Sequence, residues 1–265
     1  MQPNAQFTDE PSDAALAAWF ACEQGRYVLD WEAGALDAAV VDLFGAQALQ
    51  IGLPQHDLLR ANRMPQQFVL SADEVPHIVS DDAADASRAT PSVVLGLAHE
   101  LPFATQSLDL VLLPHGLEFV EDPHAVLREV ERVLRPEGHV LVTGFNPVSL
   151  WGIKRQFGGA TVPWSSAFIG NLRLRDWFNL LNFAPHKTEY GCYRPPVESD
   201  KWLGRFRWLE GLGARWWPFG GAVYMAHAVK KVEGMRIVGL KWKTAKPKLR
   251  FAPVAQRDAH KTSMK

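Results

Sequence analysis

The chain has 265 residues, of which 47% are hydrophobic and 22% charged, and its formal net charge is -1. These values are ordinary for a soluble globular protein and exclude an overall electrostatic attraction to nucleic acid or membranes. Cys22 and Cys192 are the two cysteines and lie far apart, which favours a reduced, cytoplasmic setting over a disulfide framework. The sequence shows neither a signal-peptide pattern nor an apolar run near the ~20 residues of a membrane span, so we expect no transmembrane segment.

The residue types predict three regions. Residues 1–44 form an N-terminal helical lead-in, with helices expected over Asp13–Cys22 and Gly25–Phe44. Residues 45–235 carry the strands of the main domain. Residues 236–265 hold nine lysines and arginines against one acid, which is typical of a disordered tail. This tail either contacts phosphates of RNA or an anionic surface, or only improves solubility. The apolar face expected of the second helix is Leu36, Val40, Val41 and Phe44.

A complete β-α-β unit is predicted between Leu101 and Gly144. Leu110–Leu113 is wholly apolar, as in a strand buried on both faces of a parallel sheet. Asp122 stands where a helix N-cap belongs, with Pro123 at the first helical position. His139–Thr143 is the next strand. The helix between them is expected to have a buried face (Val126, Leu127, Val130, Val133, Leu134), arginines in its last turn (Arg132, Arg135) and a stop at Pro136–Gly138.

Two parallel strands joined by a helix belong to an open sheet with a right-handed crossover. Such sheets bind ligands beyond the carboxyl ends of their strands. Pro114–Gly116 and Gly144–Asn146 follow the two strands of the unit, so we expect them at the functional edge.

The motifs LPF, SLD and DPHxxLREVxRVLRPEG, followed by a strand, resemble the class I S-adenosylmethionine-dependent methyltransferases, most of all the methyltransferase type 11 group. The later stretches GFNPVSLWG and RLRDWFNLLNF are similar to the bacterial YafS-like proteins of that superfamily. The resemblance implies S-adenosyl-L-methionine as cofactor. It also implies an α/β fold with a Rossmann-like seven-stranded sheet, mostly parallel with an antiparallel last strand, and helices on both faces.

The remaining elements are placed by apolar runs between turn signals. The resemblance implies that the last strand inserts between the fifth and the sixth. The expected strands are Ala48–Leu53, Phe68–Ser71, Ser92–Leu95, Lys187–Tyr193 and Ala222–Val232, and the expected helix is Leu174–Phe183.

Gly52 is the predicted contact at the cofactor turn, near the methionine end of the cofactor, and Asp73 is the predicted contact to its ribose. The family's turn after the first strand is glycine-rich, whereas here only Gly52 remains, and Leu53 and Pro54 add bulk. An acid about 20 residues further on can bind ribose hydroxyls, which fits Asp73. Glu74 nearly fits this spacing as well, and Asp81 is the alternative if the second strand is instead His77–Val79. The alternative readings are an ordinary strand-end glycine and a solvated loop carboxylate.

Ala98 and His99 are the predicted contacts to adenine. The resembled family places an aspartate after the third strand to bind the adenine amino group, but this chain has Leu97 at that position. A leucine cannot accept the hydrogen bond. The backbone of Ala98 or the side chain of His99 is then the expected contact.

Pro114 and His115 follow the fourth strand, where the resembled family lines the pocket near the transferable methyl group. Pro114 is therefore a predicted cofactor contact. His115 is the predicted catalytic residue, because an imidazole near neutral pH can accept a proton from a substrate hydroxyl or amine. The alternative is a surface or hydrogen-bonded structural histidine.

The resemblance implies a methyltransferase that moves a methyl group to an O, N or C nucleophile, with a small molecule as the expected substrate. The alternative is a methyltransferase-fold pseudoenzyme that acts as a binding or scaffolding module on RNA or an anionic membrane surface. No Cys/His cluster indicates a metal site.

The segment 201–219 mixes tryptophans with arginines. Such a mixture can stack on bases or lie at a membrane interface. The favoured reading is an amphipathic helix whose tryptophans cover the sheet and whose arginines face water.

Overall fold

The computed structural model describes residues 13–72, 90–155, 166–196, 205–206 and 208–232. The predicted basic tail and Asp73 lie outside these residues, and the predicted domain boundaries stay predictions. No described helix has the length and apolar content needed to span a bilayer.

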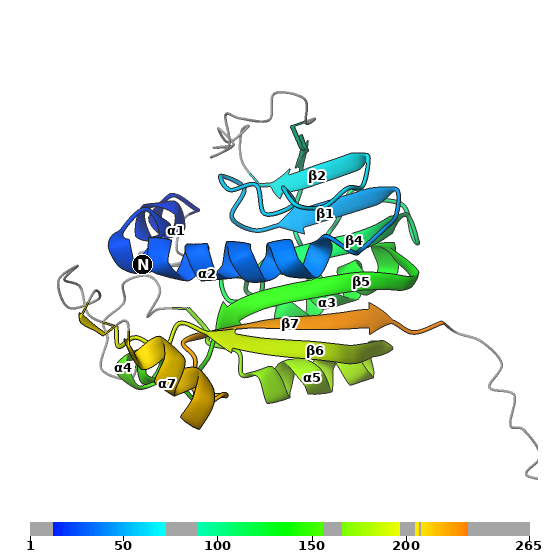
Figure 1. Ribbon diagram of the computed structural model, residues 1–265. Helices are drawn as coiled ribbons and strands as arrows, with labels where there is room; N and C mark the ends of the chain where they lie inside the picture. The colour runs from blue at the N-terminus through cyan, green and yellow to red at the C-terminus, as the bar shows by residue number, and fades with distance from the viewer. Residues whose placement is uncertain (1–12, 73–89, 156–165, 197–204, 207, 233–265) are drawn as a thin grey trace, which may run out of the picture. The chain divides into compact units, whose positions relative to one another are not determined.

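A seven-stranded sheet forms the centre of the described chain, in the order β3-β2-β1-β4-β5-β7-β6 (Figure 1). The first five strands pair in parallel, and β7 is antiparallel to both β5 and β6. The predicted fold class and the inserted last strand are therefore confirmed. The strands are β1 (Gln47–Ile51), β2 (Gln66–Ser71), β3 (Ser92–Leu95), β4 (Leu108–Pro114), β5 (Leu134–Phe145), β6 (Phe183–Gly191) and β7 (Val223–Lys230).

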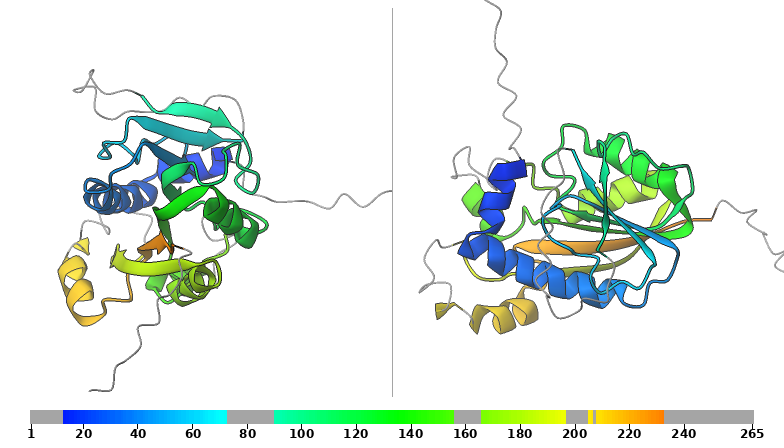
Figure 2. Two further views of the ribbon diagram at one scale, coloured as in Figure 1. Left: turned by 90° about the vertical axis from the view of Figure 1, so that its right-hand side faces the viewer. Right: turned by 90° about the horizontal axis from the view of Figure 1, so that it is seen from above.

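Helices cover both faces of the sheet (Figures 1 and 2). α1 and α2 pack on one face, and α3 and α5 on the other. The short helices α4 and α7 lie at the end of the sheet where β1, β4 and β5 finish (Figure 1). The helices are α1 (Asp13–Phe20), α2 (Glu23–Val40), α3 (Pro123–Val133), α4 (Leu150–Arg155), α5 (Asn171–Leu180) and α7 (Trp208–Trp216).

Alternate side chains of β4 belong to two separate hydrophobic clusters. Leu110 and Leu112 pack with α1 and α2, whereas Val111 and Leu113 pack with α3 and α5. All four side chains are fully buried. The strand is thus covered on both faces, as its continuous apolar sequence predicts.

The predicted start of α3 is confirmed, but its predicted end is wrong. Asp122 Oδ1 accepts hydrogen bonds from the backbone N–H groups of His124 (2.9 Å) and Ala125 (3.1 Å). The helix ends at Val133, and Leu134 already pairs with β4. Arg135 therefore lies in β5 rather than in a helical turn, and its Nη1 lies 2.9 Å from Asp109 Oδ1.

The predicted apolar face of the second helix is only partly correct. Leu36 and Val40 are buried, but Phe44 is 73% exposed. The helix ends at Val40, so residues further along no longer follow its periodicity.

Lys230, at the end of β7, holds the carboxyl end of α3. Its side chain is buried, and Nζ donates to the carbonyl oxygens of Glu131 (2.6 Å) and Leu134 (3.0 Å). Nζ also lies 2.9 Å from Glu131 Oε1. A cation at this helix end satisfies carbonyl groups that the helix itself leaves unpaired.

We expect Lys230→Met to lower the free energy of unfolding by about 2 kcal/mol, because buried carbonyl oxygens lose their donor. Urea denaturation measures the change. Lys231→Met is the matched control, since Lys231 is exposed, and it should change stability by less than about 0.5 kcal/mol. Equal effects of the two substitutions would contradict the assignment.

Candidate cofactor site at the carboxyl edge of the sheet

The loops that follow β1 and β4 approach each other closely at two glycines, where only backbone atoms lie between them. Gly52 has a φ of +102°, and a Cβ added there would lie 2.5 Å from the carbonyl oxygen of Pro114. A Cβ on Gly116 would lie 2.8 Å from the carbonyl oxygen of Ile51. Both positions therefore require glycine for conformation or for close approach. The structure brings the predicted Gly52 and Pro114 together at this edge.

Gln50, which the sequence analysis missed, organises the turn after β1. Its side chain is buried, and Nε2 donates to the carbonyl oxygens of Leu53 (3.0 Å) and His56 (2.8 Å). Its Oε1 accepts from the backbone N–H of Leu58 (3.0 Å). One amide thus fixes a turn that lacks the usual glycines. A polar residue inside an otherwise apolar strand was the available signal.

Leu53 does not place its side chain as the sequence suggested. The residue has a φ of +46°, and its side chain is 1% exposed in the cluster beneath α1 and α2. Leu58 and Leu59 belong to the same cluster. The bulk of Leu53 is therefore taken up by the hydrophobic core.

The predicted adenine contacts follow β3 at the same edge. The backbone N–H of Glu100 donates to the carbonyl oxygen of Leu97 (3.0 Å), which closes a tight turn around Ala98 and His99. Ala98 packs partly against the hydrophobic core, whereas His99 is exposed. Asp73, expected after β2, lies outside the described residues.

His115 is enclosed between two carboxylates. The residue is 1% exposed and has a φ of +52°. Its Nε2 lies 2.9 Å from Oε1 of Glu32 on α2, and its Nδ1 lies 2.6 Å from Oε2 of Glu118. Glu118 Oε1 in turn accepts from the backbone N–H of Phe145 (2.6 Å) at the end of β5. This buried network joins α2, the loop after β4 and the end of β5.

The two carboxylates control the charge of His115. Burial opposes protonation, but Glu32 and Glu118 raise the pKa of His115 to about 10. Burial also raises the pKa of Glu118, against the pull of His115. A general base needs a neutral imidazole with an accessible nitrogen. The arrangement around His115 instead matches the hydrogen-bonded structural alternative, and the general-base role stays a prediction.

Glu32 is a second residue that the sequence analysis missed. It is fully buried, and it lies among Val28, Leu36 and Val40 at four-residue spacing on the inner face of α2. An acid within an apolar helical stripe was the signal. Among the described residues, Glu32 Oε2 and Thr143 Oγ1 are buried without a hydrogen-bond partner. Such atoms mark a polar environment on the α2 side of this edge.

A separate hollow among the described residues lies away from this site. A hollow of about 610 Å³, lined by residues 60–68, Thr90 and Ser92, lies at the opposite ends of β2 and β3. Within the described ranges, no group of three or more His, Cys, Asp or Glu side chains is placed to hold a metal ion.

Comparison with known proteins relates the chain to a family and to a domain type. A family model described as "Methyltransferase domain" matches residues 57–142. The chain is 35% identical over 207 residues to YafS of Escherichia coli K12, described as uncharacterized, which covers 77% of this chain and 80% of YafS. The chain belongs to the YafS family.

Two further proteins relate the YafS-family chain to methyltransferases. The malonyl-[acyl-carrier protein] O-methyltransferase of Laribacter hongkongensis is 28% identical over 124 residues, which are 47% of this chain and 41% of that enzyme. A solved structure from Thermotoga maritima, described as a SAM-dependent methyltransferase and possible histamine N-methyltransferase, matches with a TM-score of 0.59 at 18% identity. That match covers 84% of this chain and 97% of the other. Residues 57–142 of the chain thus match a methyltransferase domain, and its fold is that of the S-adenosylmethionine-dependent methyltransferases.

We expect Gly52→Ala to destabilise the protein by about 2 kcal/mol or more, because the new Cβ meets Pro114 and the positive φ is strained. The control is Gly34→Ala in α2, where an added Cβ has open space. This control should stabilise the protein by about 0.5–1 kcal/mol. Thermal unfolding measures both changes, and a neutral Gly52→Ala would show that the two loops do not interlock.

We also expect stability to fall between about pH 6.5 and 10. A histidine whose pKa rises from 6.5 to about 10 on folding stabilises fully below pH 6.5, and this contribution is lost as pH approaches 10. Burial also raises the pKa of Glu118, so its contribution begins to fall already as pH rises above 4.5. The loss should amount to a few kcal/mol and is measured by urea denaturation across this range.

His115→Gln should remove most of this slope, at the cost of stability at pH 7. The control His99→Gln changes an exposed imidazole and should retain the slope. An unchanged slope in His115→Gln would assign the pH dependence to other groups.

Proposed function

We propose that the YafS-family chain transfers a methyl group from S-adenosylmethionine to an oxygen, nitrogen or carbon nucleophile of a small molecule, by in-line displacement. The main support is the match of residues 57–142 to a methyltransferase domain, together with the sheet order that brings the loops after β1 and β4 to one edge. The Cβ positions of Gly52 and Gly116 face the backbone of the opposite loop, so these glycines bring the two loops together at the ligand-binding edge of such a sheet. The two free cysteines, Cys22 and Cys192, agree with a cytoplasmic enzyme.

Each part of this cofactor has a predicted contact. Gly52 and Pro114 would hold its methionine end, Asp73 its ribose, and Ala98 and His99 its adenine. When bound, S-adenosylmethionine supplies an electrophilic methyl group on a positively charged sulfur. The chain's own work is then to align the nucleophile and to exclude water, which needs few catalytic side chains.

His115 acts in this proposal as a positioning residue. As an imidazolium between Glu32 and Glu118 it fixes the loop after β4 against α2. A proton released by a hydroxyl or amine substrate would pass to water or another acceptor, because His115 already holds its proton at neutral pH.

Titration calorimetry with S-adenosylmethionine tests the proposal. We expect saturable binding by the full chain and its loss in Asp73→Ala, because the ribose hydroxyls lose their acceptor. Asp85→Ala, a nearby acid in the sequence, is the matched control and should bind normally. Transfer of radiolabel from the cofactor to a panel of hydroxyl, amine and carbon nucleophiles then identifies the acceptor.

The same calorimetry distinguishes the transferase from the alternative, a binding or scaffolding module. No heat at millimolar cofactor would overturn the transferase and leave the binding or scaffolding module. Binding that Asp73→Ala leaves intact would support the cofactor but reject Asp73 as its ribose contact.

A further inference from the structure

Helix α7 is attached to the protein through its small and polar side. A Cβ added to Gly213 would lie 2.4 Å from the ring of Tyr193, so this glycine packs directly on that ring. Glu210 accepts a hydrogen bond from Tyr27, and its Oε1 lies 3.2 Å from Arg194 Nε. These contacts leave the helix with its glycine and its acid facing the protein.

The outward side of α7 is aromatic and aliphatic. Trp208, Leu212 and Trp216 recur every four residues on one helical face, with exposed fractions of 59%, 44% and 80%. Trp217 and Phe219 follow directly and are 43% and 66% exposed. We call these five residues the α7 surface. The prediction that the tryptophans of this segment cover the sheet is therefore wrong for the residues described.

Hydrogen bonds from the rest of the protein hold the residues that follow α7 in place. Tyr193 donates through its hydroxyl to the carbonyl oxygen of Pro218 (2.8 Å). The side-chain amide of Asn146, just after β5, donates to the carbonyl oxygens of Phe219 (2.7 Å) and Gly221 (2.9 Å). The α7 surface is thus fixed next to the carboxyl edge of the sheet.

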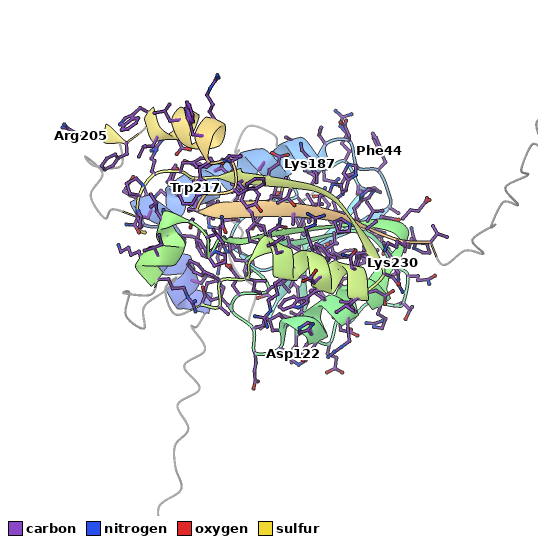
Figure 3. The ribbon with its side chains drawn as sticks, turned by 90° about the horizontal axis from the view of Figure 1, so that it is seen from below. Phe44, Asp122, Lys187, Arg205, Trp217 and Lys230 are labelled. Carbon is purple, nitrogen blue, oxygen red and sulfur yellow. The ribbon has the colours of Figure 1, made fainter. Side chains whose placement is uncertain are left out.

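The described cations of this segment, Arg205 and Arg215, are both exposed. Segment 201–219 has four cations, Lys201, Arg205, Arg207 and Arg215, against Glu210 alone, although the whole chain carries a net charge of -1. Because Glu210 turns inward to Arg194, the outer side has no acid from this segment. Figure 3 shows Arg205 at the margin of the molecule beside α7.

We propose that the α7 surface docks on an anionic lipid bilayer. Tryptophan suits the boundary between headgroups and acyl chains, because its ring is apolar and its N–H is polar. Arginines beside it attract anionic headgroups, and Leu212 and Phe219 add apolar area. A helix that presents aromatic and aliphatic side chains together on one face fits a bilayer better than RNA, where stacked aromatic rings carry the contact. The helix lies on the bilayer and does not cross it.

Vesicle flotation of the full chain tests this proposal. We expect binding to vesicles of phosphatidylglycerol and phosphatidylcholine, weaker binding at high salt, and little binding to phosphatidylcholine alone. Trp216→Ser combined with Trp217→Ser should reduce binding by about tenfold or more, because two interfacial rings are lost. The matched control is Leu172→Ser with Leu180→Ser on α5, which removes two side chains that are 77% and 78% exposed and should bind as the wild type does.

Arg215→Glu provides a second variant, because its exposed side chain can change without disturbing packing. It should weaken binding to anionic vesicles and leave thermal unfolding unchanged. The proposal is overturned if the wild type does not bind anionic vesicles, or if the tryptophan and arginine variants bind like the wild type. It is equally overturned if the tryptophan variant instead loses self-association in light scattering, or binding to a labelled RNA.

Discussion

The buried contact of Glu32, His115 and Glu118 is the interaction on which the carboxyl edge depends. Removing His115 would leave two buried carboxylates without their cation, and breaking such a buried pair typically costs about 3–5 kcal/mol. The three groups come from α2 and from the loop after β4, and Glu118 also binds the backbone of Phe145 in β5. The positions of α2, β4 and β5 are therefore coupled, since no one of them can move away without exposing or orphaning a charge.

This coupling explains how the edge tolerates an unusual turn after β1. The resembled family uses several glycines there, whereas this chain keeps Gly52 and fixes the rest through Gln50. Leu53 adopts a positive φ and places its side chain in the core beneath α1 and α2. The cost of a strained leucine is on the order of 1 kcal/mol, which burial of its side chain offsets.

Local signals in the sequence predicted most of the fold but little of the site. The apolar run of β4 and the Asp122 cap of α3 act over a few residues, so they can be read directly. The end of α3 failed because pairing of Leu134 with β4 overrides helix periodicity. The charge of His115 depends on Glu32, which lies 83 positions earlier in the chain. No spacing rule connects two residues that only the folded sheet brings together.

The orientation of α7 shows a different limit of sequence reasoning. Hydrophobicity alone would turn Trp208 and Trp216 inward, yet Gly213 and Glu210 take that side, because Tyr193 needs a neighbour without a side chain and Arg194 needs a carboxylate. Specific partners for small and polar groups thus outweigh the general tendency to bury tryptophan. A protein that leaves such rings in water forgoes roughly 1.5–3 kcal/mol of possible burial for each large side chain. The α7 surface would regain this burial free energy if its rings entered another apolar environment, such as the interior of a bilayer. The neighbouring arginines favour a bilayer with anionic headgroups.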